Sequence, residues 1–261
     1  GLKIGDQILE IDGKTVACAE DVRGALQSSQ GQITLTVSRA GKERQLRFSP
    51  ANTEDGPKMG VFLRQGIAGI GTVTFYDPAS GTFGALGHGV WDSEGLLKMT
   101  RGNAFEATVA EIKKGKAGDP GQLRGTAESP IPFAPLLKNT PQGVFGVSPH
   151  RWQGEAFATA DYESVHTGSA SIRTQIGTDQ PREYSVEILK IYPETRPDHR
   201  NFLLRVTDPD LLRATGGIVQ GMSGSPILQD GKLIGAVTHV LVNDPTTGYG
   251  IFIDNMLDAA G

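Results

Sequence analysis

The sequence predicts a mainly β protein with a small α+β segment at its N-terminal end. Two observations predict this fold class: short apolar runs alternate with turn-forming residues along most of the chain, and stretches with helical periodicity are few. The 35 glycines and 15 prolines supply the many turns that such a chain needs. With 261 residues, the chain has room for one large all-β domain and one small module.

Residues 1–50 are predicted to form the small module. A strand that carries Ile8 and Ile11 is closed by an Asp-Gly turn, a helix follows over about 19–28, and a β-rich segment covers 33–39. This order resembles the second half of a bacterial PDZ domain, a module that binds an extended peptide as an added strand. The carboxylate-binding loop and its strand precede that half in bacterial PDZ domains, so a packing role and a peptide-binding role both remain open.

Residues 51–58 are polar and turn-forming, and they are predicted to be a linker. Residues 59–261 then form the large β domain, as two packed barrels or sandwiches. The segment 114–142, rich in Gly, Pro and Lys, is expected to be a long surface connection, and a short helix is expected to begin near Ile253. The strands are expected at 59–64, 69–76, 83–87, 107–113, 144–148, 170–175, 184–192, 201–206, 217–220, 226–229, 232–240 and 248–253.

The most informative motif is the turn Gly221-Met222-Ser223-Gly224-Ser225-Pro226. A serine that attacks a carbonyl needs an exposed hydroxyl and nearby backbone N–H groups that can hold an oxyanion. Glycine permits the tight, positive-φ backbone that this geometry requires. The pattern Gly-x-Ser-Gly-x-Pro is similar to the nucleophile motif of chymotrypsin-like serine peptidases. That resemblance makes Ser223 the nucleophile and the N–H groups of Gly221 and Ser223 the oxyanion hole; a plain Gly/Ser turn is the alternative.

A nucleophilic serine also needs a base, and His88 is the best candidate among the five histidines. It stands between Gly87 and Gly89 after an apolar run. The structural alternative is that His88 is a turn residue that caps a strand. The other four lie in polar or charged loops or after a strand: His150, His166, His199 and His239, the last of which could be a core or edge residue.

Three longer blocks extend this interpretation to most of the chain. They run from Gly69 to Gly89, from Val206 to Ile227 and from Gly235 to Ile253. In this order they resemble the SpoIVB-type sporulation serine peptidases, and the resemblance covers about 60–257. It implies a PDZ domain joined to a chymotrypsin-like double β-barrel peptidase domain, with His88 as base, Asp208 as acid and Ser223 as nucleophile.

The resemblance also implies a biological role. Proteins of this family are extracytoplasmic signalling peptidases that cleave their own N-terminal region and a membrane-anchored regulatory protein, in a pathway that activates a sporulation sigma factor. We therefore expect a polypeptide substrate, no cofactor and an extracytoplasmic location reached through a targeting segment upstream of Gly1. Residues around 238–243 are expected to line the specificity pocket, by analogy with the larger clan.

Asp208 is the site residue with the least support from its spacing. A triad acid must lie behind the base in space, and in most chymotrypsin-like enzymes it follows the histidine closely, whereas Asp208 stands fifteen positions before Ser223. Asp77, Asp92 and Asp119 are the fallback candidates. An Asp-Pro turn whose carboxylate accepts a backbone N–H is the structural alternative for Asp208.

Other classes of function fit the residues less well. An α/β-hydrolase elbow needs glycine where Ser225 stands. In that fold the acid and then the histidine follow the serine, and here the only histidine after Ser223 is His239, sixteen residues on, which leaves little room for an acid element between them. No HExxH motif or His-x-x-x-His pair is present, and Cys18 is the one cysteine, so neither a zinc site nor an internal disulfide is expected. A non-catalytic interaction protein remains the alternative, although Ser223 and His88 are both intact.

Composition limits the partners. The net charge is −4 and there is no long basic block, since the lysines at 113, 114 and 116 form only a short cluster, so nucleic acid is not an expected partner. No run approaches the roughly 20 apolar residues of a membrane helix.

Overall fold

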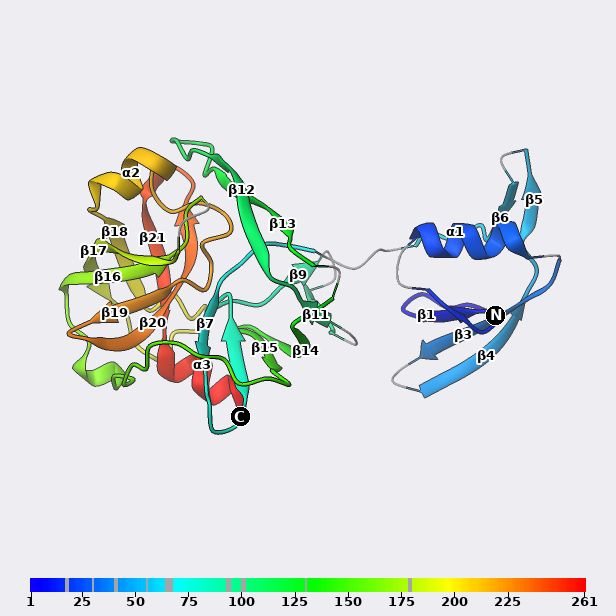
Figure 1. The fold of residues 1–261 in the computed structure, drawn as a ribbon, viewed down its shortest axis with the longest axis horizontal. Helices are drawn as coiled ribbons and strands as arrows, with labels where there is room; N and C mark the ends of the chain where they lie inside the picture. Colours follow the sequence, from blue (N-terminus) through cyan, green and yellow to red (C-terminus); the bar gives the residue numbers. More distant parts are fainter. Residues whose placement is uncertain are drawn as a thin grey trace. The chain divides into compact units, whose positions relative to one another are not determined.

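The computed structural model describes residues 1–16, 19–29, 31–39, 42–54, 56–63, 68–92, 95–99, 102–129, 131–177 and 180–261. The chain divides into two compact units, Gly1–Ala68 and Gly69–Gly261 (Figure 1). Strands dominate both units, which confirms the mainly β fold class. Among the described residues, no helix is long and apolar enough to cross a membrane. Cys18 lies outside the described residues.

The first unit is a four-stranded antiparallel sheet with one helix. The order in the sheet is β2-β1-β3-β4, and helix α1 covers the range predicted from its periodicity. Val22 and Leu26 of α1 are buried against Ile11, Leu35 and other apolar side chains of the sheet. The PDZ resemblance of this unit stays a prediction. Its elements are β1 (Gln7–Ile11), β2 (Lys14–Thr15), α1 (Ala19–Ser28), β3 (Ile33–Arg39) and β4 (Lys42–Phe48), followed by β5 (Ala51–Thr53) and β6 (Gly56–Lys58).

The segment predicted as a linker belongs to this first unit. Strands β5 and β6 pair as a hairpin within 51–58, and Met59, the next residue, is buried in the core of the unit. The structure therefore places the division between Ala68 and Gly69, about ten residues after the predicted boundary. A short hairpin is held by backbone hydrogen bonds and needs few apolar residues. Its polar composition therefore resembles that of a linker.

The second unit contains a closed barrel and an open sheet. Six antiparallel strands close in the order β16-β17-β18-β21-β20-β19, and five strands form a sheet in the order β11-β14-β15-β8-β7. The elements are β7 (Val73–Tyr76), β8 (Thr82–Ala85), β9 (Trp91–Asp92), β10 (Gly95–Leu96), β11 (Gly102–Ala104), β12 (Ala107–Lys113), β13 (Gln122–Ala127), β14 (Ala134–Thr140), β15 (Gly143–Val147), the 3-10 turn Tyr162–Ser164, β16 (Gly168–Thr174), β17 (Arg182–Ile191), β18 (Phe202–Val206), α2 (Pro209–Thr215), β19 (Pro226–Gln229), β20 (Lys232–Leu241), β21 (Asp244–Phe252) and α3 (Ile253–Ala260).

The barrel contains the main hydrophobic core. Along β17 every second side chain is buried, namely Tyr184, Val186 and Ile188, as expected for a strand with one face turned inward. Phe202 packs edge-on against Phe252 inside the barrel, with 4.6 Å between ring centroids. The predicted two barrels are therefore one closed barrel and one sheet that stays open.

The segment 114–142 differs from its prediction as a surface connection. It holds all of β13, which pairs with β12, and all of β14, which joins the five-stranded sheet. Both strands carry exposed polar residues and little apolar alternation, so their backbone pairing partners define them more than their own side chains do. The predicted strands at 59–64 and 217–220 are absent from the described residues there.

Helix α2 begins at Asp208 and Pro209, where the sequence analysis predicts only an Asp-Pro turn. Asp208 stands at its N-cap, Pro209 at its first position and Gly216, with φ of 76°, at its C-cap. This is the usual order of helix start and stop residues. The signal was thus present in the sequence over 208–216.

Candidate active site

Ser223 lies in a tight turn between α2 and β19. Gly221 and Gly224 on either side have φ of 100° and 91°, a region that favours glycine. Between them the side chain of Met222 is fully buried, and its N–H donates to the carbonyl of Val219 over 3.1 Å. The buried methionine anchors the turn in the barrel core and fixes the direction of Ser223.

The backbone around Ser223 offers two hydrogen-bond donors. In the described part of the chain, neither the N–H of Gly221 nor that of Ser223 donates to a protein acceptor, whereas the N–H groups of Met222, Gly224 and Ser225 do. Unpaired N–H groups at a tight turn are what an oxyanion hole requires. The turn can therefore hold a developing negative charge beside Ser223.

The Ser223 hydroxyl is directed at strand β20. Its Oγ donates to the carbonyl oxygen of Thr238 over 3.0 Å, and the Thr238 hydroxyl in turn donates to the carbonyl of Tyr249 on β21. The C-terminal half of β20, which includes 238–241 of the predicted pocket segment, thus begins beside Ser223.

His88 lies in the loop that follows β8. Its Nδ1 is 2.9 Å from the carbonyl oxygen of Gly89. Because a carbonyl oxygen can only accept, Nδ1 carries the proton in this contact and Nε2 is left as the acceptor nitrogen. Burial lowers the pKa of His88 below its ordinary value, and the Gly89 hydrogen bond opposes this effect. A neutral imidazole with a free Nε2 is the form that a general base needs.

Backbone contacts bring the His88 loop and the Ser223 turn together. The N–H of Thr72 donates to the carbonyl of Ser223 over 2.8 Å, and the N–H of Leu86 donates to the carbonyl of Thr72 over 3.2 Å. The hydroxyl of Thr74 donates to the carbonyl of Gly224 over 2.8 Å. Strand β7 and the chain before it therefore connect the open sheet to the barrel at Ser223. Ser223 and His88 share no hydrogen bond in this structure.

Asp208 lies at the start of α2 and does not contact His88. Its Oδ1 accepts from the N–H groups of Asp210 over 2.9 Å and Leu211 over 3.0 Å, and Oδ2 is 3.5 Å from the N–H of Ser185. These contacts are those of a helix cap, the structural alternative for this residue. The ring nitrogen of His88 that a triad carboxylate would hold is bonded to Gly89 instead. The acid role of Asp208 has no contact to support it here and stays a prediction.

The fallback carboxylates have partners of their own. Asp77 accepts from the N–H of Ala79 and from Ser80 within its turn, and Asp119 forms an ion pair with Lys113 at 2.8 Å. Asp92 lies on β9. The pKa of His88 is shifted by burial and by the Gly89 hydrogen bond, and no carboxylate contributes to the shift.

His239 was missed as a possible site residue. It follows Thr238 on β20, and its ring centroid lies 5.0 Å from that of His88, with 40° between the ring planes. From the sequence it reads as a core or edge residue of a strand, and no local signal distinguishes it. The other histidines have contacts elsewhere: His166 with Asp230, His199 with Gln142, and His150 is exposed.

Within the described ranges there is no group of three or more His, Cys, Asp and Glu side chains arranged to hold a metal ion. The sequence likewise lacks the motifs of common zinc sites.

A half-buried histidine, a serine in a glycine turn and two free backbone N–H groups beside a six-stranded barrel are the groups that a serine peptidase needs. The family model for the SpoIVB peptidase S55 matches residues 55–257. The chain therefore belongs to the SpoIVB peptidase S55 family, as the three sequence blocks indicated.

Curated relatives match only part of this chain. A "putative zinc metalloprotease" of Agrobacterium fabrum is 43% identical over 84 residues, which are 32% of this chain and 21% of the relative. Another from Vibrio cholerae is 33% identical over 122 residues, or 46% of this chain and 26% of the relative. A third, from Rhizobium meliloti, is 29% identical over 125 residues, 46% of this chain and 33% of the relative. The chain thus spans a fifth to a third of the length of these relatives.

Among solved structures, the Rv3671c protease of M. tuberculosis is similar. Its active form is 18% identical, with a TM-score of 0.39, over 62% of this chain and 78% of that one. Its inactive form is 19% identical, with a TM-score of 0.36, over 52% of this chain and 69% of that one.

Proposed function

We propose that this protein is a serine endopeptidase in which Ser223 is the nucleophile and His88 the general base. The observation that carries the proposal is the meeting of three segments at one point: the Ser223 turn, the loop of His88 and the strand of Thr238. The Ser223 hydroxyl must turn from Thr238 toward His88 before it reacts. Catalytic hydrogen bonds are often formed only when substrate is bound, so this rotation is compatible with the role.

The chemistry follows from these positions. Nε2 of His88 takes the proton of the Ser223 hydroxyl as Oγ attacks the carbonyl carbon of the substrate, and the N–H groups of Gly221 and Ser223 hold the oxyanion. The imidazole then gives its proton to the leaving amine, and water releases the acyl group by the reverse path. An extended polypeptide segment is the substrate, and residues 238–243 line the pocket beside it.

The finer biological role is also a proposal. The family supports an extracytoplasmic signalling peptidase that cleaves its own N-terminal region and a membrane-associated regulatory protein in a sporulation-type pathway. The alternative is a non-catalytic interaction protein with a peptidase-like barrel.

A serine-directed fluorophosphonate tests the proposed enzyme directly. We expect the wild-type chain to be labelled, and peptide mapping by mass spectrometry to place the label on Ser223. An unlabelled protein that also fails to cleave casein or itself would favour the interaction protein instead.

The pH dependence of activity should reflect the burial of His88. Because burial lowers the pKa of this imidazole, it remains unprotonated to a lower pH than an exposed histidine would. The acid limb of kcat/KM is therefore expected to have its midpoint below about 6.5. Steady-state rates between roughly pH 4 and pH 8 would measure it, and a midpoint above 6.5 would contradict the assignment of His88 in this environment.

Substitution of Asp208 separates a capping role from an acid role. Asparagine caps a helix about as well as aspartate, so the free energy of unfolding of Asp208→Asn should lie within about 0.5 kcal/mol of the wild-type value. Asp208→Ala, which removes the cap, should lower the free energy of unfolding by about 1 kcal/mol. Because the contacts of Asp208 are with the backbone of α2 and Ser185, we expect Asp208→Asn to retain activity. A loss of about 10⁴-fold in kcat with unchanged folding would instead assign Asp208 as the triad acid.

A further inference from the structure

The second imidazole at the site, His239, has no role in the chemistry described above. Its ring lies 5.0 Å from the ring of His88, centroid to centroid, on the residue that follows the acceptor of the Ser223 hydroxyl. Its Nδ1 is buried and, among the described residues, has no hydrogen-bond partner. Burying an unpaired polar atom costs free energy, and an apolar residue would avoid that cost. Because Nδ1 forms no hydrogen bond with the described residues, the contact of His239 with the site is the one between its ring and the ring of His88.

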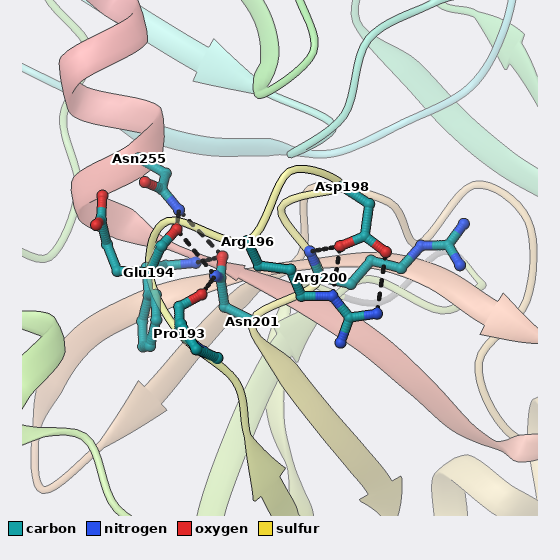
Figure 2. Close-up of polar contacts among 8 residues, drawn as sticks. Pro193, Glu194, Arg196, Asp198, Arg200, Asn201 and Asn255 are labelled. Atoms are coloured by element: carbon teal, nitrogen blue, oxygen red, sulfur yellow. Dashed lines mark hydrogen bonds and ion pairs between the residues drawn. The ribbon is translucent and has the colours of Figure 1, made fainter.

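Burial keeps the His239 imidazole neutral. Burial is the largest cause that lowers the pKa of His239 to about 4, followed by the charges of His88 and Arg200, while Asp198 acts in the opposite direction. The Asp198 carboxylate is engaged by the guanidinium of Arg196 at 2.6 and 3.0 Å and by the backbone N–H of Arg200 at 3.2 Å (Figure 2). With a pKa of about 4, His239 is therefore uncharged near neutral pH.

The loop that carries these charges is fixed in place. Asn201, at its end, is fully buried; its side chain donates to the carbonyls of Pro193 and Glu194 and accepts from Asn255 of α3 (Figure 2). The guanidinium of Arg200 lies 5.1 Å from the ring centroid of Tyr249, the residue paired with His239 across β20 and β21. The residues around His239 are thus held by hydrogen bonds and by packing against strand β21 and helix α3.

Among the described residues, His88 is held by a hydrogen bond to the next residue. The carbonyl of Gly89 accepts from Nδ1 and fixes the tautomer. In a triad, a carboxylate from another element holds the imidazole in its orientation. Here the ring of His239, from strand β20, lies beside the ring of His88.

We propose that His239 is a positioning residue for His88: its neutral ring packs beside the base and holds the imidazole where Nε2 can take the Ser223 proton. This inference rests on the proposed function. The proton passes from Ser223 Oγ to His88 Nε2 as the Oγ–carbon bond forms, and from Nε2 to the leaving amine as the carbon–nitrogen bond breaks. His239 gains and loses no proton in either step.

The test compares three substitutions in the full chain. His239→Ala and His239→Leu remove the flat ring, and the leucine keeps apolar volume should the alanine variant fail to fold. His239→Phe keeps a flat ring without nitrogen atoms. We expect kcat of the first two to fall about 10- to 100-fold with KM within about twofold, since small displacements of a catalytic group have effects of this size, and His239→Phe to recover most of the loss. His150→Ala, at an exposed histidine, is the matched control.

A second readout does not depend on activity. In the Ser223→Ala background, NMR titration of the His88 imidazole should show its pKa rising toward the ordinary value in His239→Ala, because water reaches the ring, and staying low in His239→Phe. If wild-type Ser223 is not labelled, the proposed function fails, but this titration still tests the contact. Wild-type kcat together with an unshifted His88 titration in the alanine or leucine variant would overturn the inference. So would a phenylalanine variant that folds but is as slow as the alanine one, because then the nitrogens of His239 and not its ring would be required.

Discussion

Replacing Ser223 with alanine should abolish peptide cleavage, with kcat reduced by about 10⁶-fold. In the proposed mechanism the hydroxyl oxygen of Ser223 forms the bond of the acyl-enzyme, and alanine has no oxygen to replace it. The residual rate should be only about 10³–10⁴ over the uncatalysed reaction, from the oxyanion donors and binding. Casein cleavage, self-cleavage and fluorophosphonate labelling of wild type and variant side by side measure the effect.

Ser225→Ala provides the matched control for that experiment. Ser225 lies two residues away, is fully buried, and its Oγ has no hydrogen-bond partner in the described structure. Removing an unpaired buried hydroxyl costs little or is favourable, so this variant should keep its activity and its stability. If Ser223→Ala cleaved as fast as Ser225→Ala, the nucleophile would have to lie elsewhere and the proposed function would fall.

Gly224→Ala is expected to have the second largest effect, on both stability and activity. A Cβ at Gly224 would overlap the carbonyl oxygen of Thr72 and lie 2.6 Å from the backbone nitrogen of Leu86. These are backbone atoms that hold the Ser223 turn to the open sheet, so they cannot move away without breaking the hydrogen bonds between Thr72 and Ser223 and between Leu86 and Thr72. The φ of 91° adds strain of about 1–3 kcal/mol for any residue other than glycine.

The measurements for Gly224→Ala are the free energy of unfolding and the labelling rate of Ser223. We expect a loss of more than about 2 kcal/mol in stability. Because Ser223 precedes the altered residue, labelling in the folded fraction should slow by about 100-fold. Gly154→Ala is the control, since a Cβ there meets no atom within 4 Å. A Gly224→Ala protein as stable and as reactive as that control would show that the contact between the turn and the open sheet does not position the nucleophile.

Several features of the protein were determined by the sequence alone. The barrel strands β17, β18 and β20 were predicted within a few residues because their buried side chains are apolar and closely spaced. Helix α1 was predicted over its observed range because Val22 and Leu26 recur on one face. The glycine turn at Ser223 was predicted from the sequence because glycine is the residue that adopts positive φ angles, such as those of Gly221 and Gly224, without strain.

Other features were decided only by tertiary structure. Strands β13 and β14 exist because neighbouring strands supply their hydrogen bonds, so their own residues carry little signal. The contact of His88 with His239, and that of Asp208 with Ser185, depend on which rings and backbone groups the fold brings near each side chain. A sequence identifies which residue types can perform the chemistry, but pairing between residues far apart in the chain fixes their distances. Distances decide which nitrogen is free, which carboxylate is already bonded and which imidazole lies beside the base.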